Sequence, residues 1–223
     1  MNKYMALIHG YDIYKNFNYK KYPTRIFGWN INSELYKTYI DTIQPELILE
    51  LGTWLGGSAI AMAKIIKEKG ITTKIICVDT WLGSLEFIGL KEKDEHRSLV
   101  PINGHPTIYN QFLANVIHEN LQDIIIPLPN TIHLACTFLS INNIHADIIY
   151  VDGDNTFESV YSDLNNSWPL LNNKGVIFGD DLQNAGFPGI RFGLNKFCLE
   201  QNIEYHPVTN FDNFWEIYKK HNI

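Results

Sequence analysis

The stretch LILELGTWLGGS, residues 47–58, decides the fold of this chain. It begins with a short apolar run of the kind that forms a buried central strand. Glu50 lies at the end of that run, and three glycines, of which Gly52 is the first, then bracket a tight turn. The following residues, SAIAMAKIIKEKG, predict an amphipathic helix that ends at Gly70. A strand, a glycine turn and a helix in this order indicate an open α/β sheet with a ligand at the helix N-terminus.

The spacing of the turn narrows the choice of ligand. It reads E-x-G-x-x-x-G, which differs from the G-x-G-x-x-G that places a pyrophosphate on a helix, and no G-K-[ST] of a P-loop follows. A carboxylate in front of the glycines suits a cationic group, such as a sulfonium or an α-ammonium, better than a phosphate. A turn without any ligand explains this motif, taken alone, equally well.

Composition indicates the class of protein. At 223 residues and 45% hydrophobic content, the chain is long enough for one well-buried domain, and we expect a single domain over residues 1–223. A net charge of −6 argues against nucleic acid as a partner. The cysteines have no CxxC spacing, so we expect reduced thiols. No signal peptide, lipidation motif or membrane-spanning window is found, which predicts a cytoplasmic protein with no membrane partner. A homodimer is left open.

Strands and helices alternate along the chain, which predicts a mostly parallel, doubly wound sheet with helices on both faces. Residues 1–30 have little periodicity and are expected to form an N-terminal arm. Residues 80–106 are too long for an ordinary connection and are expected to form a lid over a site. The expected strands are 47–49, 74–79, 123–129, 146–154 and 175–181, followed by an antiparallel pair within 204–220. The expected helices are 31–43, 58–69, 107–121, 131–143, 156–171 and 189–201.

Acidic residues stand at or just beyond four strand ends, where open α/β sheets bind ligands. Asp79 follows the second strand and is placed to accept hydrogen bonds from both ribose hydroxyls of a nucleoside, although a plain turn residue is the alternative. Asp152, Asp180 and Asp181 form a second group, whose mutual repulsion a divalent cation would relieve. Mg²⁺ is the expected ion. In the alternative, one of the paired aspartates caps a helix and Asp152 contacts a ribose or an amine.

Four segments, taken together, resemble the class I S-adenosylmethionine-dependent methyltransferases. They are ELGTWLGGSAIAMAK, ICVDTWLGS, FLANVIHENLQDIIIPLPNT and ADIIYVDGDNTFESVYSDLNNSWPLLNNKGVIFGDD. The chain is most similar to the macrocin and sugar-type small-molecule O-methyltransferases, over roughly residues 45–200. The resemblance implies a Rossmann-like methyltransferase fold with an antiparallel last strand. It also implies a cofactor site, with metal ligands at Asp152, Asp180 and Asp181. The implied cofactor-binding residues are Glu50, Gly52, Trp54 and Ser58 at the methionine end, Asp79 at the ribose, and Asn130 and Thr131 near the adenine.

One position departs from the family pattern. Relatives carry a His or Lys three residues after the first metal aspartate, where this chain has Asn155. An amide cannot act as a base near neutral pH. We therefore expect Asp152 or Asp154 to be the catalytic base, with His96 and His105 of the long insertion as further candidates that are more typical of surface loops.

The sequence thus predicts an enzyme that transfers a methyl group from S-adenosylmethionine to a hydroxyl group of a small acceptor. Sugars or glycans are the candidate acceptors, and divalent-metal assistance is expected. A nicotinamide-dependent oxidoreductase is the alternative enzyme class, which the missing G-x-G-x-x-G disfavours. A degenerate protein that binds the cofactor without turnover is the non-enzymatic alternative, which Asn155 keeps open.

Overall fold

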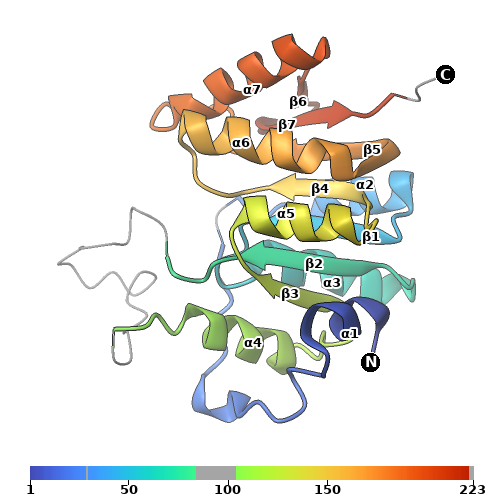
Figure 1. Cartoon of the computed structure of the whole chain (residues 1–223), viewed down its shortest axis with the longest axis vertical. Coiled ribbons are helices and arrows are strands. Elements are labelled where there is room, and N and C mark those ends of the chain that lie inside the picture. The colour runs from blue at the N-terminus through green and yellow to red at the C-terminus, as the bar shows by residue number, and fades with distance from the viewer. Residues whose placement is uncertain (29, 84–103, 221–223) are drawn as a thin grey trace.

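The chain forms a seven-stranded sheet with the strand order β3-β2-β1-β4-β5-β7-β6 (Figure 1). The computed structural model describes residues 1–28, 30–83 and 104–220. Strands β1 to β5 are mutually parallel, whereas β7 is antiparallel to both β5 and β6. This topology confirms the doubly wound, mostly parallel sheet with a reversed last strand. The strands are β1 (Leu47–Leu51), β2 (Lys74–Asp79), β3 (Ile125–Pro129), β4 (Ala146–Val151), β5 (Leu171–Gly179), β6 (His206–Val208) and β7 (Phe211–Tyr218).

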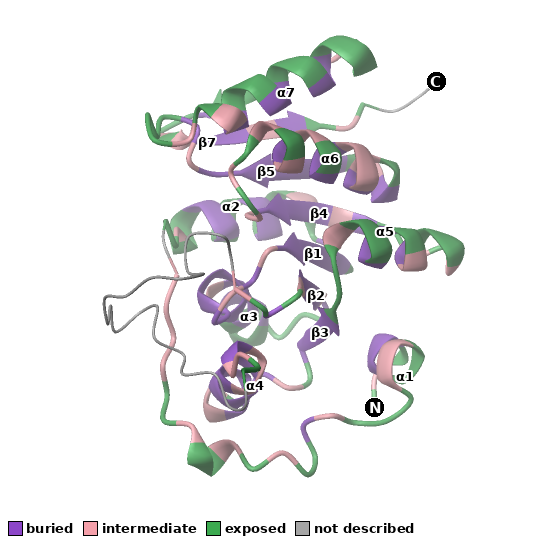
Figure 2. Ribbon diagram, turned by 60° about the vertical axis from the view of Figure 1, so that its left-hand side comes forward, coloured by how far each residue is buried: buried purple, intermediate pink, exposed green. Residues whose placement is uncertain are grey.

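Helices cover both faces of the sheet, as Figures 1 and 2 show. Since parallel crossovers are right-handed, the helices of β1-α3-β2 and β2-α4-β3 lie on one face together with α2. Those that connect β3 to β4 and β4 to β5 lie on the other face, where α6 packs against α7. The helices are α1 (Lys3–His9), α2 (Ser33–Ile43), α3 (Gly57–Lys69), α4 (Ile108–His118), α5 (Ile132–Ile141), α6 (Phe157–Ser167) and α7 (Pro188–Gln201), with short 3₁₀ turns η1 (Tyr19–Lys21) and η3 (Trp168–Leu170).

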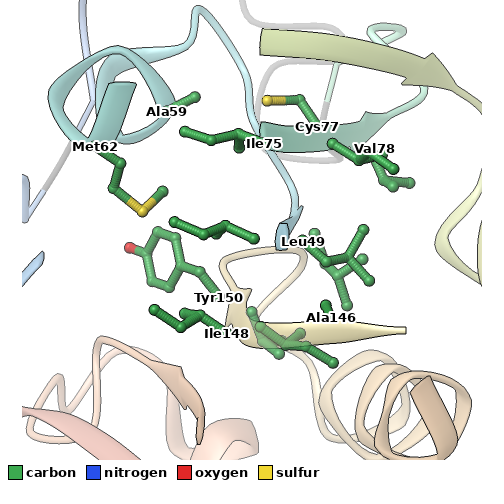
Figure 3. Close-up of a cluster of buried hydrophobic side chains, with 14 of the residues drawn as sticks. Leu49, Ala59, Met62, Ile75, Cys77, Val78, Ala146, Ile148 and Tyr150 are labelled. Carbon is green, nitrogen blue, oxygen red and sulfur yellow. The ribbon is translucent and has the colours of Figure 1, made fainter. Parts of the chain in front are cut away.

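The core lies between the sheet and these two helix layers. Every residue of β1 is buried, because a central parallel strand is covered on both faces. Figure 3 shows Met62 of α3 pointing toward Tyr150 of β4. The Tyr150 ring stacks on Phe178 of β5 with 4.7 Å between ring centroids. These contacts pack α3 and β5 against β4 beneath the site.

One strand boundary differs clearly from the sequence prediction. The strand was expected to begin at Gly175, but β5 begins at Leu171 and so includes Lys174. Lys174 has a positive φ of 68°, and the pairing of β4 with β5 shifts register at this point. A Cβ on Gly175 would lie 2.6 Å from the carbonyl oxygen of Asp147. The glycine is needed for the close approach of two strands at a bulge rather than for a turn.

The N-terminal arm packs along the β3 edge of the sheet and along α4. The Tyr14 hydroxyl donates to the carbonyl of Ile125 at 3.1 Å, and the Asn115 amide donates to the carbonyl of Arg25 at 2.8 Å. Among the described arm residues, Gly28 and Asn30 line a cavity at the carboxyl ends of the parallel strands. The arm thus contributes to the site through its last residues.

Most of the expected lid, including His96, lies outside the described residues. Thr80 and Gly83, at its start, line the same cavity. His105, at its end, is exposed and is not a cavity-lining residue. Each helix among the described residues is too short or too polar to cross a membrane.

Candidate active site

A cavity of about 980 Å³ opens above the carboxyl ends of the parallel strands. This volume lies in the range of small-molecule and cofactor sites. Residues that follow all five parallel strands reach it, so the cavity occupies the crevice in which doubly wound sheets bind ligands. The residues at these strand ends that line it are Gly52, Asp79, Asn130, Asp152, Asp180 and Asp181.

The glycine turn after β1 forms one wall of the cavity. Gly52 has a φ of 88°, and a Cβ there would lie only 2.0 Å from the carbonyl oxygen of Asp152. Gly56 is the N-cap of α3, and as a glycine it supplies no side-chain cap. Gly57 and Ser58, the first two helical residues, line the cavity. An uncapped helix N-terminus at a cavity is a ready site for an anionic group.

Glu50 lies beneath this wall and is not a cavity-lining residue. Its carboxylate is fully buried and accepts hydrogen bonds from the hydroxyls of Ser58 at 2.5 Å and Thr53 at 2.8 Å. Burial raises the pKa of Glu50 to about 7. In this structure Glu50 supports the turn from below, and the Ser58 hydroxyl donates to Glu50.

Asp79 ties the glycine turn to the end of β2. One carboxylate oxygen accepts the backbone N–H groups of Thr53 at 3.0 Å and Trp54 at 2.8 Å. The other accepts the N–H of Trp81 at 2.7 Å. Asp79 and Trp54 both line the cavity, and a carboxylate has about four acceptor positions. Acceptor capacity for a ligand hydroxyl therefore remains.

Asn130 and Thr131 line the cavity beyond Asp79. The Asn130 N–H donates to the backbone carbonyl of Asp79 at 3.0 Å, which joins the ends of β3 and β2. The Thr131 hydroxyl caps α5 by accepting the N–H of Leu134 at 3.3 Å. Both residues lie where a ligand that reaches past Asp79 would meet them.

Asp152 and Asp154 follow β4 but have different surroundings. Asp152 is half-buried, and its pKa is raised well above the usual range by desolvation and then by the negative charges of Asp180 and Glu50. Asp154 is exposed, and its carboxylate accepts the N–H of Thr156 at 3.1 Å at the start of α6. Of the two expected bases, Asp152 has the environment of a proton acceptor.

The expected metal ligands are not arranged as a metal site. Across residues 1–28, 30–83 and 104–220, no three acidic, histidine or cysteine side chains form a group that could hold a metal ion. Instead, the side-chain amide of Asn30 donates to Asp180 at 2.9 Å and to Asp181 at 3.0 Å. The amide relieves part of the repulsion between the two carboxylates. The described arrangement does not fit the expected three-aspartate magnesium centre, and we assign no step to a metal.

Several cavity-lining residues were missed from the sequence, among them Asn30 and Asp163. Asn30 belongs to an arm without periodicity, so no pattern marked it. Asp163, on α6, is buried together with Val160, Leu164 and Ser167 of the same helix. That helical spacing was a readable sign that Asp163 faces inward. Asn155 also lines the cavity, as the departure from the family pattern anticipated.

Comparisons with known proteins place this geometry in a family. Residues 49–182, more than half of the chain, match the family model described as a methyltransferase domain. A relative, the uncharacterized protein y4gI of Sinorhizobium fredii, is 23% identical over 144 residues, which cover 65% of this chain and 14% of the relative. The chain thus spans about a seventh of that protein's length.

Solved structures share the fold. The O-methyltransferase NovP is 16% identical, with a TM-score of 0.61 over 85% of this chain and 79% of NovP. The calicheamicin methyltransferase CalS11 is 14% identical, with a TM-score of 0.59 over 83% of this chain and 76% of CalS11. An O-methyltransferase from Bacillus cereus, solved with S-adenosylhomocysteine (SAH), is 15% identical, with a TM-score of 0.54 over 90% and 86%. At these identities the likeness concerns the fold, and the family model carries the assignment: the chain belongs to the methyltransferase domain family.

Proposed function

We propose that this protein is an S-adenosylmethionine-dependent O-methyltransferase that acts on a hydroxyl group of a small acceptor. One observation carries the proposal. The cavity brings together an uncapped helix N-terminus, the Asp79 carboxylate and the Asp152 carboxyl group. The helix N-terminus would bind the carboxylate of the cofactor, and Asp79 would bind its ribose. Asp152 would take the proton of the acceptor.

The cofactor side of the cavity fits S-adenosylmethionine by charge and hydrogen bonding. The first N–H groups of α3, at Gly57 and Ser58, would donate hydrogen bonds to the cofactor carboxylate. Asp79 would hold the ribose hydroxyls with its remaining acceptor capacity. Trp54 and Gly52 would line the methionine end, and Asn130 and Thr131 the adenine end. Glu50 would act only indirectly, through Thr53 and Ser58.

Methyl transfer requires an acceptor oxygen that can lose its proton. Bound S-adenosylmethionine supplies an electrophilic methyl group on a sulfonium. With that group bound, the acceptor oxygen would take the methyl group as the S–CH₃ bond breaks, and the bonding electron pair would stay on sulfur. Asp152 takes the hydroxyl proton, since its raised pKa brings a carboxylate closer to the range of an effective base. The rest of the catalysis is alignment of donor and acceptor.

Sugars are the acceptor class that we propose first. CalS11 is described as a TDP-rhamnose 3′-O-methyltransferase, and it shares the fold. The cavity lining also carries groups that hydrogen-bond hydroxyls, among them Asn155, Ser159, Ser162 and Asn184.

The proposed function is tested by a turnover assay. The protein is incubated with S-adenosylmethionine and a panel of nucleotide sugars, free glycosides and catechols, and SAH formation is measured by chromatography. We expect acceptor-dependent SAH formation with at least one hydroxylated acceptor. SAH binding without turnover on any acceptor of the panel would instead favour the degenerate binding protein.

A further inference from the structure

Trp81 is a buried tryptophan that joins two walls of the cavity without lining it. Its side chain is 1% exposed, and it is not a cavity-lining residue. Its backbone N–H donates to the Asp79 carboxylate at 2.7 Å, and its indole Nε1–H donates to the backbone carbonyl of Trp54 at 2.9 Å. Asp79 and Trp54 both line the cavity. Trp81 therefore connects the end of β2 to the glycine turn that follows β1.

Trp54 has a backbone conformation that residues with a Cβ rarely adopt. Its φ is 51°, in the left-handed region. Such residues persist where their surroundings hold them, and they gather at ligand sites. The N–H of Trp54 donates to Asp79 at 2.8 Å, and its carbonyl accepts the indole N–H of Trp81. Two residues at the end of β2 thus hold the backbone of this cavity wall from both sides of one residue.

Helix α4 fixes the indole ring of Trp81. The ring centroid of Trp81 lies 4.9 Å from that of Tyr109 and 5.0 Å from that of Phe112, both in tilted arrangements. Aromatic pairs at these distances attract each other. Phe112 also lies against the glycine turn, since a Cβ on Gly56 would be 3.0 Å from its ring. The packing on α4 therefore directs the indole N–H toward Trp54.

We propose that Trp81 is a positioning residue for the cofactor, which keeps the glycine turn aligned with Asp79 through its indole N–H. Without this donor, the Trp54 carbonyl loses its partner and the left-handed conformation of Trp54 loses one of its two restraints. The turn then shifts relative to Asp79, together with the first N–H groups of α3. The inference rests on the proposed function, because its readout is cofactor binding. It goes beyond that function, because Trp81 itself contacts no ligand.

The test compares matched tryptophan variants by calorimetric titration with SAH and by thermal unfolding. Trp81→Phe keeps an aromatic ring but removes the indole donor. Trp168→Phe makes the same change outside the cavity lining, where the ring packs on Phe197 with 5.8 Å between centroids. Loss of one hydrogen bond should weaken SAH binding about tenfold in Trp81→Phe, whereas Trp168→Phe should change it less than about twofold. A merely structural role would lower the melting temperature of Trp81→Phe and leave its SAH affinity unchanged.

Turnover provides a second readout. In Trp81→Phe, the KM for S-adenosylmethionine should rise about tenfold, whereas kcat at saturating cofactor should stay within about threefold of the wild-type value. This split is the result expected when a residue aligns the binding site and takes no part in proton transfer.

The outcomes separate the inference from the function on which it rests. If the wild-type protein binds SAH and Trp81→Phe binds it equally tightly, the inference is overturned and the proposed function stands. If the wild-type protein does not bind SAH, both are overturned. Should Trp81→Phe fail to fold, β-(3-benzothienyl)alanine is incorporated in place of Trp81, which keeps the bicyclic ring and replaces only the N–H by sulfur. Unchanged SAH affinity in that protein would contradict the positioning role.

Discussion

Glu50, Asp79 and Asp152 lie around the same glycine turn, yet their hydrogen-bond partners give them different chemistry. The Glu50 carboxylate is enclosed by two hydroxyls, Asp79 is held by three backbone N–H groups, and Asp152 faces the cavity beside other acids. Backbone N–H groups stabilise an ionised carboxylate, whereas burial beside like charges favours the protonated form. From these surroundings we propose a binding role for Asp79 and a proton-transfer role for Asp152.

Replacing Asp152 tests the proposed base. Asp152→Asn keeps the size of the side chain but removes its ability to accept a proton. We expect kcat to fall by about 10²–10⁴-fold, the usual contribution of a positioned base, while SAH affinity changes less than threefold. Steady-state kinetics and calorimetry measure the two quantities. Equal losses in kcat and in cofactor affinity would assign Asp152 to binding instead.

The raised pKa of Glu50 predicts that the free energy of unfolding depends on pH. Its pKa is raised from an ordinary 4.5 to about 7 in the folded protein, so the folded state binds more protons than the unfolded state between these values. The stabilisation from protonated Glu50 is therefore complete below about pH 4.5 and is lost as the pH rises through 7.

Glu50→Gln removes this titration. Relative to the wild-type protein, the variant should gain stability between pH 5 and pH 8, by an amount on the order of 1–3 kcal/mol. Thermal unfolding at several pH values provides the measurement. A difference between the two proteins that stays constant over this range would show that Glu50 does not titrate there.

At the scale of elements, the turn between β1 and α3 needs glycine for two separate reasons. Gly52 combines a φ of 88° with a carbonyl oxygen 2.0 Å from the position of a Cβ. Gly70, at the end of α3, has a φ of 64° but open space around it. We expect Gly52→Ala to cost more than 3 kcal/mol or to prevent folding, and Gly70→Ala to cost about 1 kcal/mol. Urea unfolding compares them, and equal costs would contradict the tight contact at Gly52.

The elements were predicted well where one local signal decides them. The apolar run of β1 and the glycines before α3 fix a buried strand and a helix start, and both are confirmed. The bulge at Lys174 was not predictable, because Gly175 serves a contact with the neighbouring strand rather than a local turn. Asn30 escaped prediction for the same reason, since its partners lie 150 and 151 positions away in the chain.

At the scale of the whole molecule, Asn30 joins the N-terminal arm to the end of β5. Its amide occupies hydrogen-bond positions on both Asp180 and Asp181, and it lowers the pKa of Asp180, which burial otherwise raises. A protein amide can thus stabilise these carboxylates without a cation. We therefore expect turnover to persist after dialysis against EDTA.

The control for this prediction is Asn30→Ala, which leaves the paired carboxylates without their shared donor. The variant should be destabilised by about 1–3 kcal/mol, because hydrogen bonds to charged groups are lost. If the activity of the wild-type protein is lost with EDTA and returns with Mg²⁺, a metal ion replaces the Asn30 amide at these carboxylates. That result would support the magnesium site expected from the sequence.

Most of the candidate cofactor-binding residues line the cavity at the carboxyl ends of the five parallel strands. This is also where folds of this kind bind ligands. The measurement that tests its assignment most directly is calorimetric titration of the protein with SAH, with NADH as the comparison ligand. We predict saturable binding of SAH with one site per chain and none of NADH. Asp79→Ala should weaken SAH by about 10–100-fold, since charge-assisted hydrogen bonds to the ribose are lost. Absence of SAH binding, or an affinity that Asp79→Ala leaves unchanged, would contradict the cofactor site described here.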